Sequence, residues 1–135
     1  MNILVIDAQG GGIGRQLVSA VKKNFPDAVL TAIGTNSMAT SAMRKAGADF
    51  AATGENAVIV ACRKADIIVG PIGIVIADAL LGEISPAMVL AIGQSPAKRI
   101  LLPMNHCDNI VVGVTDLNVS GLIQQAVEQI RNLMQ

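Results

Sequence analysis

Short runs of consecutive apolar residues alternate along the chain with segments in which apolar residues recur every three or four positions. Runs of this length are typical of strands buried on both faces of a sheet, and the spaced segments are typical of amphipathic helices. The predicted strands are residues 2–7, 28–33, 49–53, 66–70, 99–102 and 109–114. The predicted helices are residues 12–24, 36–46, 55–65, 73–81, 86–92 and 118–134.

The regular alternation of strands and helices predicts an α/β fold. Consecutive strands joined through helices form parallel sheets with right-handed crossovers, and the helices cover both faces. No internal repeat, charge block or linker divides the sequence. We therefore predict one Rossmann-like domain over residues 1–135, a three-layer sandwich with a mostly parallel sheet of five to six strands.

The composition points to a second subunit. Hydrophobic residues make up 52% of the sequence and charged residues only 15%. Part of this apolar excess is expected to be covered by another copy of the chain. The most suggestive segment is the apolar stretch 72–92, and on this basis we predict a homodimer.

The charge balance and the scarcity of aromatic residues argue against nucleic-acid binding. Lys and Arg together number 10, as do Asp and Glu, so no basic surface is expected to attract a phosphate backbone. Aromatic residues make up 1%, too few to form stacking platforms. No apolar run reaches the roughly 20 residues that span a bilayer, and neither a leader nor a disulfide framework is expected. We expect a cytoplasmic protein that binds neither nucleic acid nor membrane.

The most informative segment is residues 6–17, IDAQGGGIGRQL, which joins the first predicted strand to the first predicted helix. Such a loop leaves the carboxyl end of its strand, where open α/β sheets bind ligands. The helix behind it offers free N–H groups and a partial positive charge, and glycines let a phosphate approach the backbone. We predict a small phosphate-bearing ligand bound by Asp7, Gln9, Gly10, Gly11, Gly12, Ile13, Gly14 and Arg15. The alternative is a tight turn that only packs the helix against the sheet.

Asp7 has two interpretations within this segment. A carboxylate beside an anion site repels a phosphate unless its charge is neutralised or a hydroxyl occupies it. We favour a structural role, in which Asp7 accepts hydrogen bonds from N–H groups of the loop or caps the helix.

Two known phosphate-binding loops are similar to this segment in part. It resembles the Thr-Gly-x-x-x-Gly-Ile-Gly loop of short-chain dehydrogenases, with Asp7 in the threonine position, Ala8 in that of the first glycine, and a good match over residues 12–15. That family's reaction needs a tyrosine, and this chain has none, which excludes such a dehydrogenase. In the phosphate loop of nucleotide hydrolases, Gly-Lys-Ser/Thr is required where Gly14-Arg15-Gln16 stands, which argues against an ATPase.

Two further loops are predicted at the same edge of the sheet. After the second strand come Gly34, Thr35 and Asn36. They lack the Asp or Glu that often holds a ribose hydroxyl. Their polar groups suit an adenosine or, with Arg15, a 2′-phosphate, but a helix cap is the favoured interpretation. The fourth strand is followed by small, stiff residues that permit a close ligand and equally make an ordinary turn: Gly70, Pro71 and Gly73.

A third loop holds the only histidine of the chain. Asn105, His106 and Cys107 precede Asp108, and histidine, thiol and carboxylate groups serve acid–base or nucleophilic chemistry. Neighbours on a short loop rarely point the same way, and this set is a poor metal site, so no metal is predicted. Cys62 falls within a helical pattern and is expected in the core.

Taken whole, the chain resembles a family of short bacterial proteins, common in anaerobic Gram-positive bacteria, whose domain is of unknown function. The segments that carry the resemblance are NILVIDAQGGGIGRQL, ADIIVGPIGI and RILLPMN. The resemblance spans nearly the full length and implies a Rossmann-like fold, without assigning a reaction or site residues.

Three functional hypotheses follow. The leading one is a nucleotide- or dinucleotide-binding module with a sensor or accessory role, whose ligand is NAD(P) or another nucleotide. The second is an enzyme on a small phosphorylated or carboxylated metabolite that uses Asp7, His106 or Cys107. The third is a purely structural homodimeric subunit.

Overall fold

The computed structural model describes residues 1–104, 108–114 and 118–135. Strands and helices alternate along the chain, as predicted. The elements are β1 (Asn2–Asp7), α1 (Gly12–Asn24), β2 (Val29–Gly34), α2 (Ser37–Lys45), β3 (Phe50–Thr53), α3 (Glu55–Cys62), β4 (Ile67–Pro71), the short 3₁₀ helix η1 (Ile72–Val75), α4 (Pro86–Gln94), β5 (Lys98–Leu102) and α5 (Val119–Leu133).

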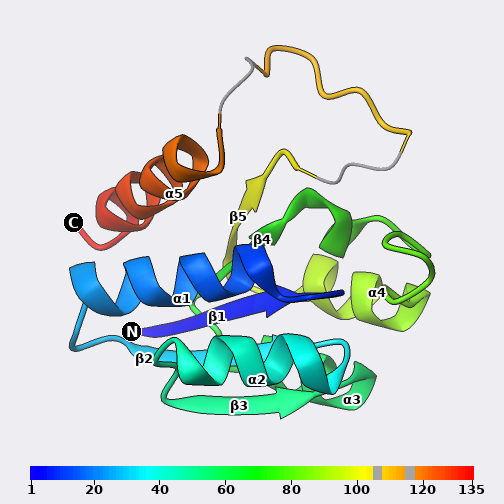
Figure 1. Cartoon of the computed structure of the whole chain (residues 1–135), viewed down its shortest axis with the longest axis horizontal. Coiled ribbons are helices and arrows are strands. Elements are labelled where there is room, and N and C mark those ends of the chain that lie inside the picture. Colours follow the sequence, from blue (N-terminus) through cyan, green and yellow to red (C-terminus); the bar gives the residue numbers. More distant parts are fainter. Residues whose placement is uncertain (105–107, 115–117) are drawn as a thin grey trace.

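The described strands form one sheet in the order β3-β2-β1-β4-β5, with every neighbouring pair parallel. The chain winds outward from β1 to β3, crosses back to β4 beside β1, and continues to β5 (Figure 1). The winding direction therefore reverses between β1 and β4, and ligands of such sheets bind outside the carboxyl ends of the strands at this point. The predicted Rossmann-like fold is confirmed.

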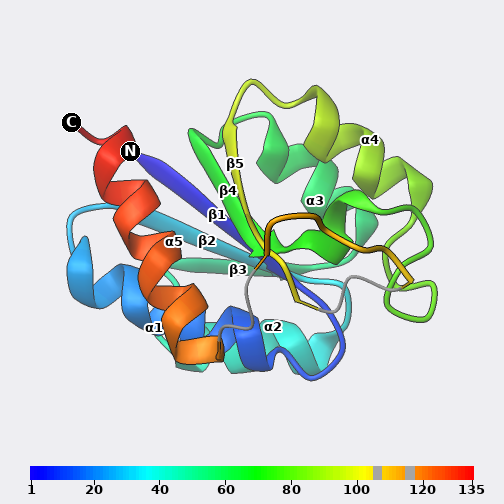
Figure 2. The same cartoon turned by 90° about the horizontal axis from the view of Figure 1, so that it is seen from above.

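Helices cover both faces of the sheet and make three layers (Figure 2). Alternate residues of β1 point to opposite faces, as the pleat requires. Ile3 and Val5 pack under α1, α2 and α5, whereas Leu4 and Ile6 pack under α3 and α4. All four side chains are buried, which explains why the strand reads as a continuous apolar run.

Side-chain caps set the starts of three helices. Asn36 Oδ1 accepts a hydrogen bond of 2.9 Å from the amide of Ala39 at the start of α2. Ser85 caps α4, and Asn118 caps α5 in the same way. The favoured interpretation of Asn36 as a helix cap is confirmed.

The predicted helix at residues 73–81 is wrong. Only Ile72–Val75 is helical there, as a single 3₁₀ turn. Asp78, Leu80 and Leu81 then adopt φ values of 64°, 57° and 59°, and this left-handed conformation cannot continue a right-handed helix. Segment 76–84 is instead folded into consecutive turns, which backbone hydrogen bonds such as that from the Asp78 amide to the Ile84 carbonyl close.

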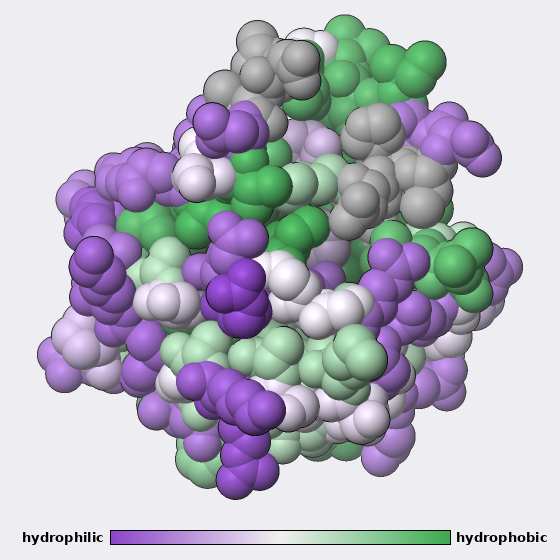
Figure 3. Space-filling view, viewed as in Figure 1, coloured by the Kyte–Doolittle hydropathy of each residue, from purple (hydrophilic) through white to green (hydrophobic). Residues whose placement is uncertain are grey.

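The predicted sixth strand at residues 109–114 is also wrong. The described sheet has five strands, and Gly113 adopts a φ of 86°, which breaks the extended conformation. Ile110 and Val112 are 91% and 94% exposed. Figure 3 shows the apolar part of the segment 108–114 as a projection from the surface. Across the described ranges, no helix is long and apolar enough to cross a membrane.

Candidate functional site

Asp7 ends β1 and joins that strand to the start of α1. Its Oδ1 accepts a hydrogen bond of 2.8 Å from the amide of Ala8, and its Oδ2 accepts one of 2.7 Å from the amide of Gly14. Gly14 is the third residue of α1, so the carboxylate satisfies one of the amides that a helix start leaves free. The geometry matches the structural role that we favoured for Asp7.

Burial is the largest influence on the pKa of this carboxyl group. Asp7 is 5% exposed, and burial raises its pKa above the ordinary value. The amides of Gly14 and Ala8 oppose this rise, and the charge of Glu83 adds to it. At any given pH, Asp7 is therefore protonated to a greater extent than a surface aspartate.

Two glycines of the loop are required by the fold itself. Gly11 has a φ of 74°, and a Cβ there would lie 2.8 Å from the Cα of Ala39. A Cβ on Gly14 would lie 2.6 Å from the sulfur of Met43 and 2.7 Å from the Cβ of Asp7. Both positions exclude a side chain because the loop and α1 pack tightly against α2 and β1. The tight-turn interpretation therefore explains Gly11 and Gly14.

The turn does not explain Gly10 and Gly12. Both are exposed, neither has a positive φ, and a Cβ on either would meet nothing within 4 Å. Ordered glycine costs backbone entropy relative to other residues, so these positions need a reason outside the packing. They border a small cleft of about 200 Å³. The residues that line it are Asp7, Ala8, Gln9, Gly10, Gly11, Gly12, Ile13 and Leu80.

Three residues that line this cleft have backbone amides without an acceptor in the described part of the chain. The amide of Gly11 donates to the carbonyl of Ala8 at 3.0 Å, and those of Gln9 and Gly14 donate to carboxylates. Within the described ranges, the amides of Gly10, Gly12 and Ile13 donate to no protein group. Since Gly12 and Ile13 begin α1, their amides lie at the positive end of the helix dipole.

Hydrogen bonds to Glu83 connect the loop after β2 to the glycine loop, and the sequence pattern did not single out this residue. Its Oε1 accepts hydrogen bonds from the Gln9 amide at 3.0 Å, Thr35 Oγ1 at 2.6 Å and Asn36 Nδ2 at 2.7 Å. The same Nδ2 of Asn36 also donates to the carbonyl of Gln9 at 2.9 Å. Burial alone would raise the pKa of Glu83, but these hydrogen bonds outweigh it and hold the pKa below its ordinary value.

Only a weak signal in the sequence pointed to Glu83. It is one of two acids in the apolar stretch 72–92, and it lies between the predicted helices at residues 73–81 and 86–92. Its partner Thr35 is 48 residues away in the chain, and residue spacing carries no information about such a contact.

The other predicted site residues do not line the cleft. Gly34 and Gly70 are explained by packing, because a Cβ on them would lie 2.5 Å from the Thr40 amide and the Ile6 carbonyl oxygen, respectively. Pro71 and Gly73 are buried, and the side chain of Arg15 is exposed. These positions remain at the carboxyl edge of the sheet, around the cleft rather than in it.

The candidate residues of the third loop, Asn105, His106 and Cys107, lie outside the described residues. Cys62 is buried in the core under β1 and β4, as predicted. Burial raises the pKa of its thiol to about 11, so at neutral pH it is a protonated core residue and not a nucleophile. Among the residues that the structure describes, no three His, Cys, Asp or Glu side chains gather as they would around a metal ion.

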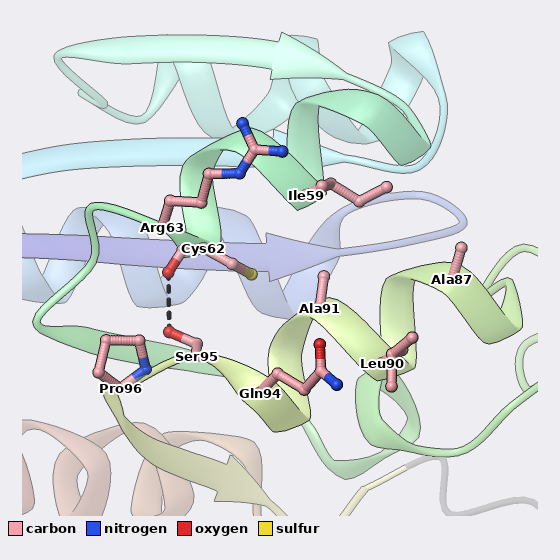
Figure 4. Close-up of a pocket in the computed structure, with 9 residues that line it drawn as sticks. All are labelled: Ile59, Cys62, Arg63, Ala87, Leu90, Ala91, Gln94, Ser95 and Pro96. Carbon is pink, nitrogen blue, oxygen red and sulfur yellow. Dashed lines mark hydrogen bonds between the residues drawn. The ribbon is translucent and has the colours of Figure 1, made fainter.

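A larger apolar groove lies between α3 and α4, on the side of the sheet opposite α1. It encloses about 400 Å³, and Figure 4 shows the side chains that border it. Leu90 is 58% exposed at this groove, and the hydroxyl of Ser95 donates to the carbonyl of Cys62 at 2.8 Å across one end. The groove contains few polar groups and offers a surface for contact more than a site for chemistry.

Known structures resemble this fold distantly. One is a dodecameric FMN-dependent Ubix-like decarboxylase from Escherichia coli O157:H7, with a TM-score of 0.48 and 14% identity over 99% of this chain and 94% of that one. Another is an arsenate reductase in a phosphate-binding state, with a TM-score of 0.45 and 15% identity over 98% of this chain and 95% of that one. No curated protein matches the sequence.

The sequence itself matches one family over nearly its whole length. The match covers residues 2–135 and so includes β1, the glycine loop, the Glu83 segment and α5. This agrees with the resemblance carried by the N-terminal, central and RILLPMN segments. The chain belongs to the family described as a domain of unknown function, DUF3842.

Proposed function

We propose that the protein binds a nucleotide, a dinucleotide or another phosphate-bearing ligand at the glycine loop after β1. The observation that carries the proposal is the division of the glycines. The fold needs Gly11 and Gly14, whereas Gly10 and Gly12 meet no neighbour and border a cleft. Access of a ligand to the backbone supplies the missing reason for these two residues.

The arrangement of donors supports an anionic group in the cleft. The amides of Gly10, Gly12 and Ile13 have no acceptor in the described part of the chain, and two of them begin α1 at the switch point of the sheet. Helix starts at this position bind phosphates through their amides and dipole. The amides of Ala8 and Gly14 offset the charge of Asp7, which reduces its repulsion of a phosphate.

The role that we propose is that of a sensor or accessory protein of the bacterial cytoplasm, acting as a homodimer. Support for self-association comes from the exposed Leu90 at the α3–α4 groove, within the apolar stretch that prompted the prediction.

A ligand screen with a designed variant tests the site. We would measure thermal unfolding by circular dichroism, which needs no Trp or Tyr, with NAD, NADP, FMN, FAD, ATP, GTP, S-adenosylmethionine, coenzyme A and inorganic phosphate. A ligand at about a hundred times its Kd stabilises the fold by roughly 2.7 kcal/mol, which raises the Tm by several degrees. Gly12→Val has room in the fold but covers the cleft, so it should abolish the shift.

Gly93→Val is the matched control. Gly93 is an exposed helix glycine, and a Cβ added there would also meet nothing within 4 Å. It lies in the last turn of α4, near the amino end of β5, whereas the cleft lies at the carboxyl ends of the strands. It should keep the ligand shift of the wild type. Absence of any shift in the wild-type protein, or an equal shift in Gly12→Val, would overturn the proposal in favour of a purely structural turn.

A further inference from the structure

The carboxylate of Glu83 lies between the loops that follow β1 and β2. Its Oε1 accepts hydrogen bonds from the backbone amide of Gln9 in the first loop and from the side chains of Thr35 and Asn36 in the second. Glu83 itself belongs to the turn segment 76–84 that follows η1. A residue from a third segment therefore supplies an acid next to the end of β2, where the local sequence has none.

One oxygen of this carboxylate remains available. Among the described residues, no group donates to Oε2 of Glu83, and the side chain is partly exposed. Three donors fix the position of Oε1, and they keep the pKa of Glu83 below its ordinary value. Oε2 is therefore a charged acceptor held in a defined place, and a hydroxyl is the natural partner for such an oxygen.

A hydrogen bond with Gln9 connects Glu83 to the cleft. Gln9 lines the cleft, and its backbone amide donates to Glu83. On the other side, Thr35 is the first residue after β2. In Rossmann-like sheets, the ribose next to the bound phosphates is held by an acid beyond the end of the second strand. Through its contacts with Thr35 and Asn36, Glu83 lies beside the end of β2 in space, although it is far from β2 in sequence.

We infer that Glu83 recognises the ribose of the ligand by accepting a hydrogen bond from its 2′-hydroxyl on Oε2. The inference rests on the proposed function and narrows it to ribonucleotides and dinucleotides with a free 2′-hydroxyl. A 2′-phosphate would place negative charge next to the carboxylate of Glu83, and the two groups would repel each other. Arg15, the cation that would have to compensate for it, is exposed and does not line the cleft.

The test compares two ligand pairs on two variants. NAD and NADP differ only in the 2′-phosphate, and ADP and 2′-deoxyADP differ only in the 2′-hydroxyl. Calorimetric titration should show that the wild type binds NAD and ADP at least about tenfold more tightly than their partners, as expected for a hydrogen bond to a charged group. Glu83→Gln keeps the shape of the side chain and should reduce both preferences to about threefold or less.

Asp78→Asn is the matched control, because it removes an exposed carboxylate from the same segment and its backbone φ of 64° suits Asn as well as Asp. It should keep the preferences of the wild type. Equal affinities within each pair for the wild-type protein, or unchanged preferences in Glu83→Gln, would overturn the inference.

The two proposals fail in different ways. If only inorganic phosphate or FMN binds, and Gly12→Val removes that binding, the phosphate site stands and the ribose assignment is wrong. If none of the probes binds the wild-type protein, the phosphate site itself is wrong.

Discussion

The Oδ2 of Asp7 lies 2.7 Å from the backbone nitrogen of Gly14, and the absence of a side chain on Gly14 allows this approach. The last residue of the central strand thus holds the start of the first helix directly. A Cβ on Gly14 would lie 2.7 Å from the Cβ of Asp7 and 2.6 Å from the sulfur of Met43, so the contact also depends on how α2 packs.

Gly14→Ala should destabilise the fold by about 1–3 kcal/mol, the usual cost of overpacking a tight contact. Gly10→Ala is the matched control, since its Cβ meets nothing within 4 Å and its φ is not positive. Urea unfolding followed by circular dichroism measures both. Equal unfolding midpoints for the two variants would show that Asp7 and Met43 move aside without a loss of stability, which would contradict tight packing around Gly14.

The raised pKa of Asp7 predicts a pH dependence of stability. The folded protein holds the Asp7 proton more tightly than the unfolded chain, whose pKa is near the ordinary 3.8. The stabilisation from this proton is fully present below the unfolded pKa and is lost as the pH rises through the folded pKa.

Asp7→Asn tests this contribution, because the variant cannot titrate at this position. The free energy of unfolding of the wild type, minus that of Asp7→Asn, should fall as the pH rises from below 3.8. Urea titrations at several pH values measure the difference. A difference that rises with pH would mean that the two amide hydrogen bonds dominate over burial.

Leu90→Asp should disrupt the proposed homodimer, because it places a charge on the apolar rim of the α3–α4 groove. Light scattering should give about twice the chain mass of 13.9 kDa for the wild type and the monomer mass for the variant. Met38→Asp is the control, since Met38 is 68% exposed on α2, across the sheet from the groove. A wild-type protein that is monomeric at micromolar concentration would reject the dimer.

Much of the fold could be predicted because local pattern and global topology agree. The apolar run at residues 2–7 and the helical spacing at 12–24 match β1 and α1 to the residue. The errors occurred where local pattern and backbone conformation disagree. Residues 73–81 have a helical composition, but Asp78, Leu80 and Leu81 are left-handed. Residues 109–114 have the composition of a strand, but the chain turns at Gly113.

The candidate site was predictable only in part, for a different reason. A glycine-rich loop after a strand is a local feature, and the sequence contains it in one piece. The sequence does not show which of these glycines the fold requires. That distinction depends on Ala39 and Met43, which leave no room for a side chain at positions 11 and 14, and on the open space at positions 10 and 12. The contact of Glu83 with Thr35 depends on the turn segment 76–84, of which the pattern misassigned residues 76–81 as a helix.

The division of the glycines also bears on how this loop evolves. Positions 11 and 14 are constrained by packing, so they should remain glycine in every descendant that keeps the fold, with or without a ligand. Positions 10 and 12 have no such constraint, and under the proposed function a lineage that loses its ligand is free to replace them. Side chains at these two positions would therefore mark the members of the family in which binding has been lost while the architecture survives.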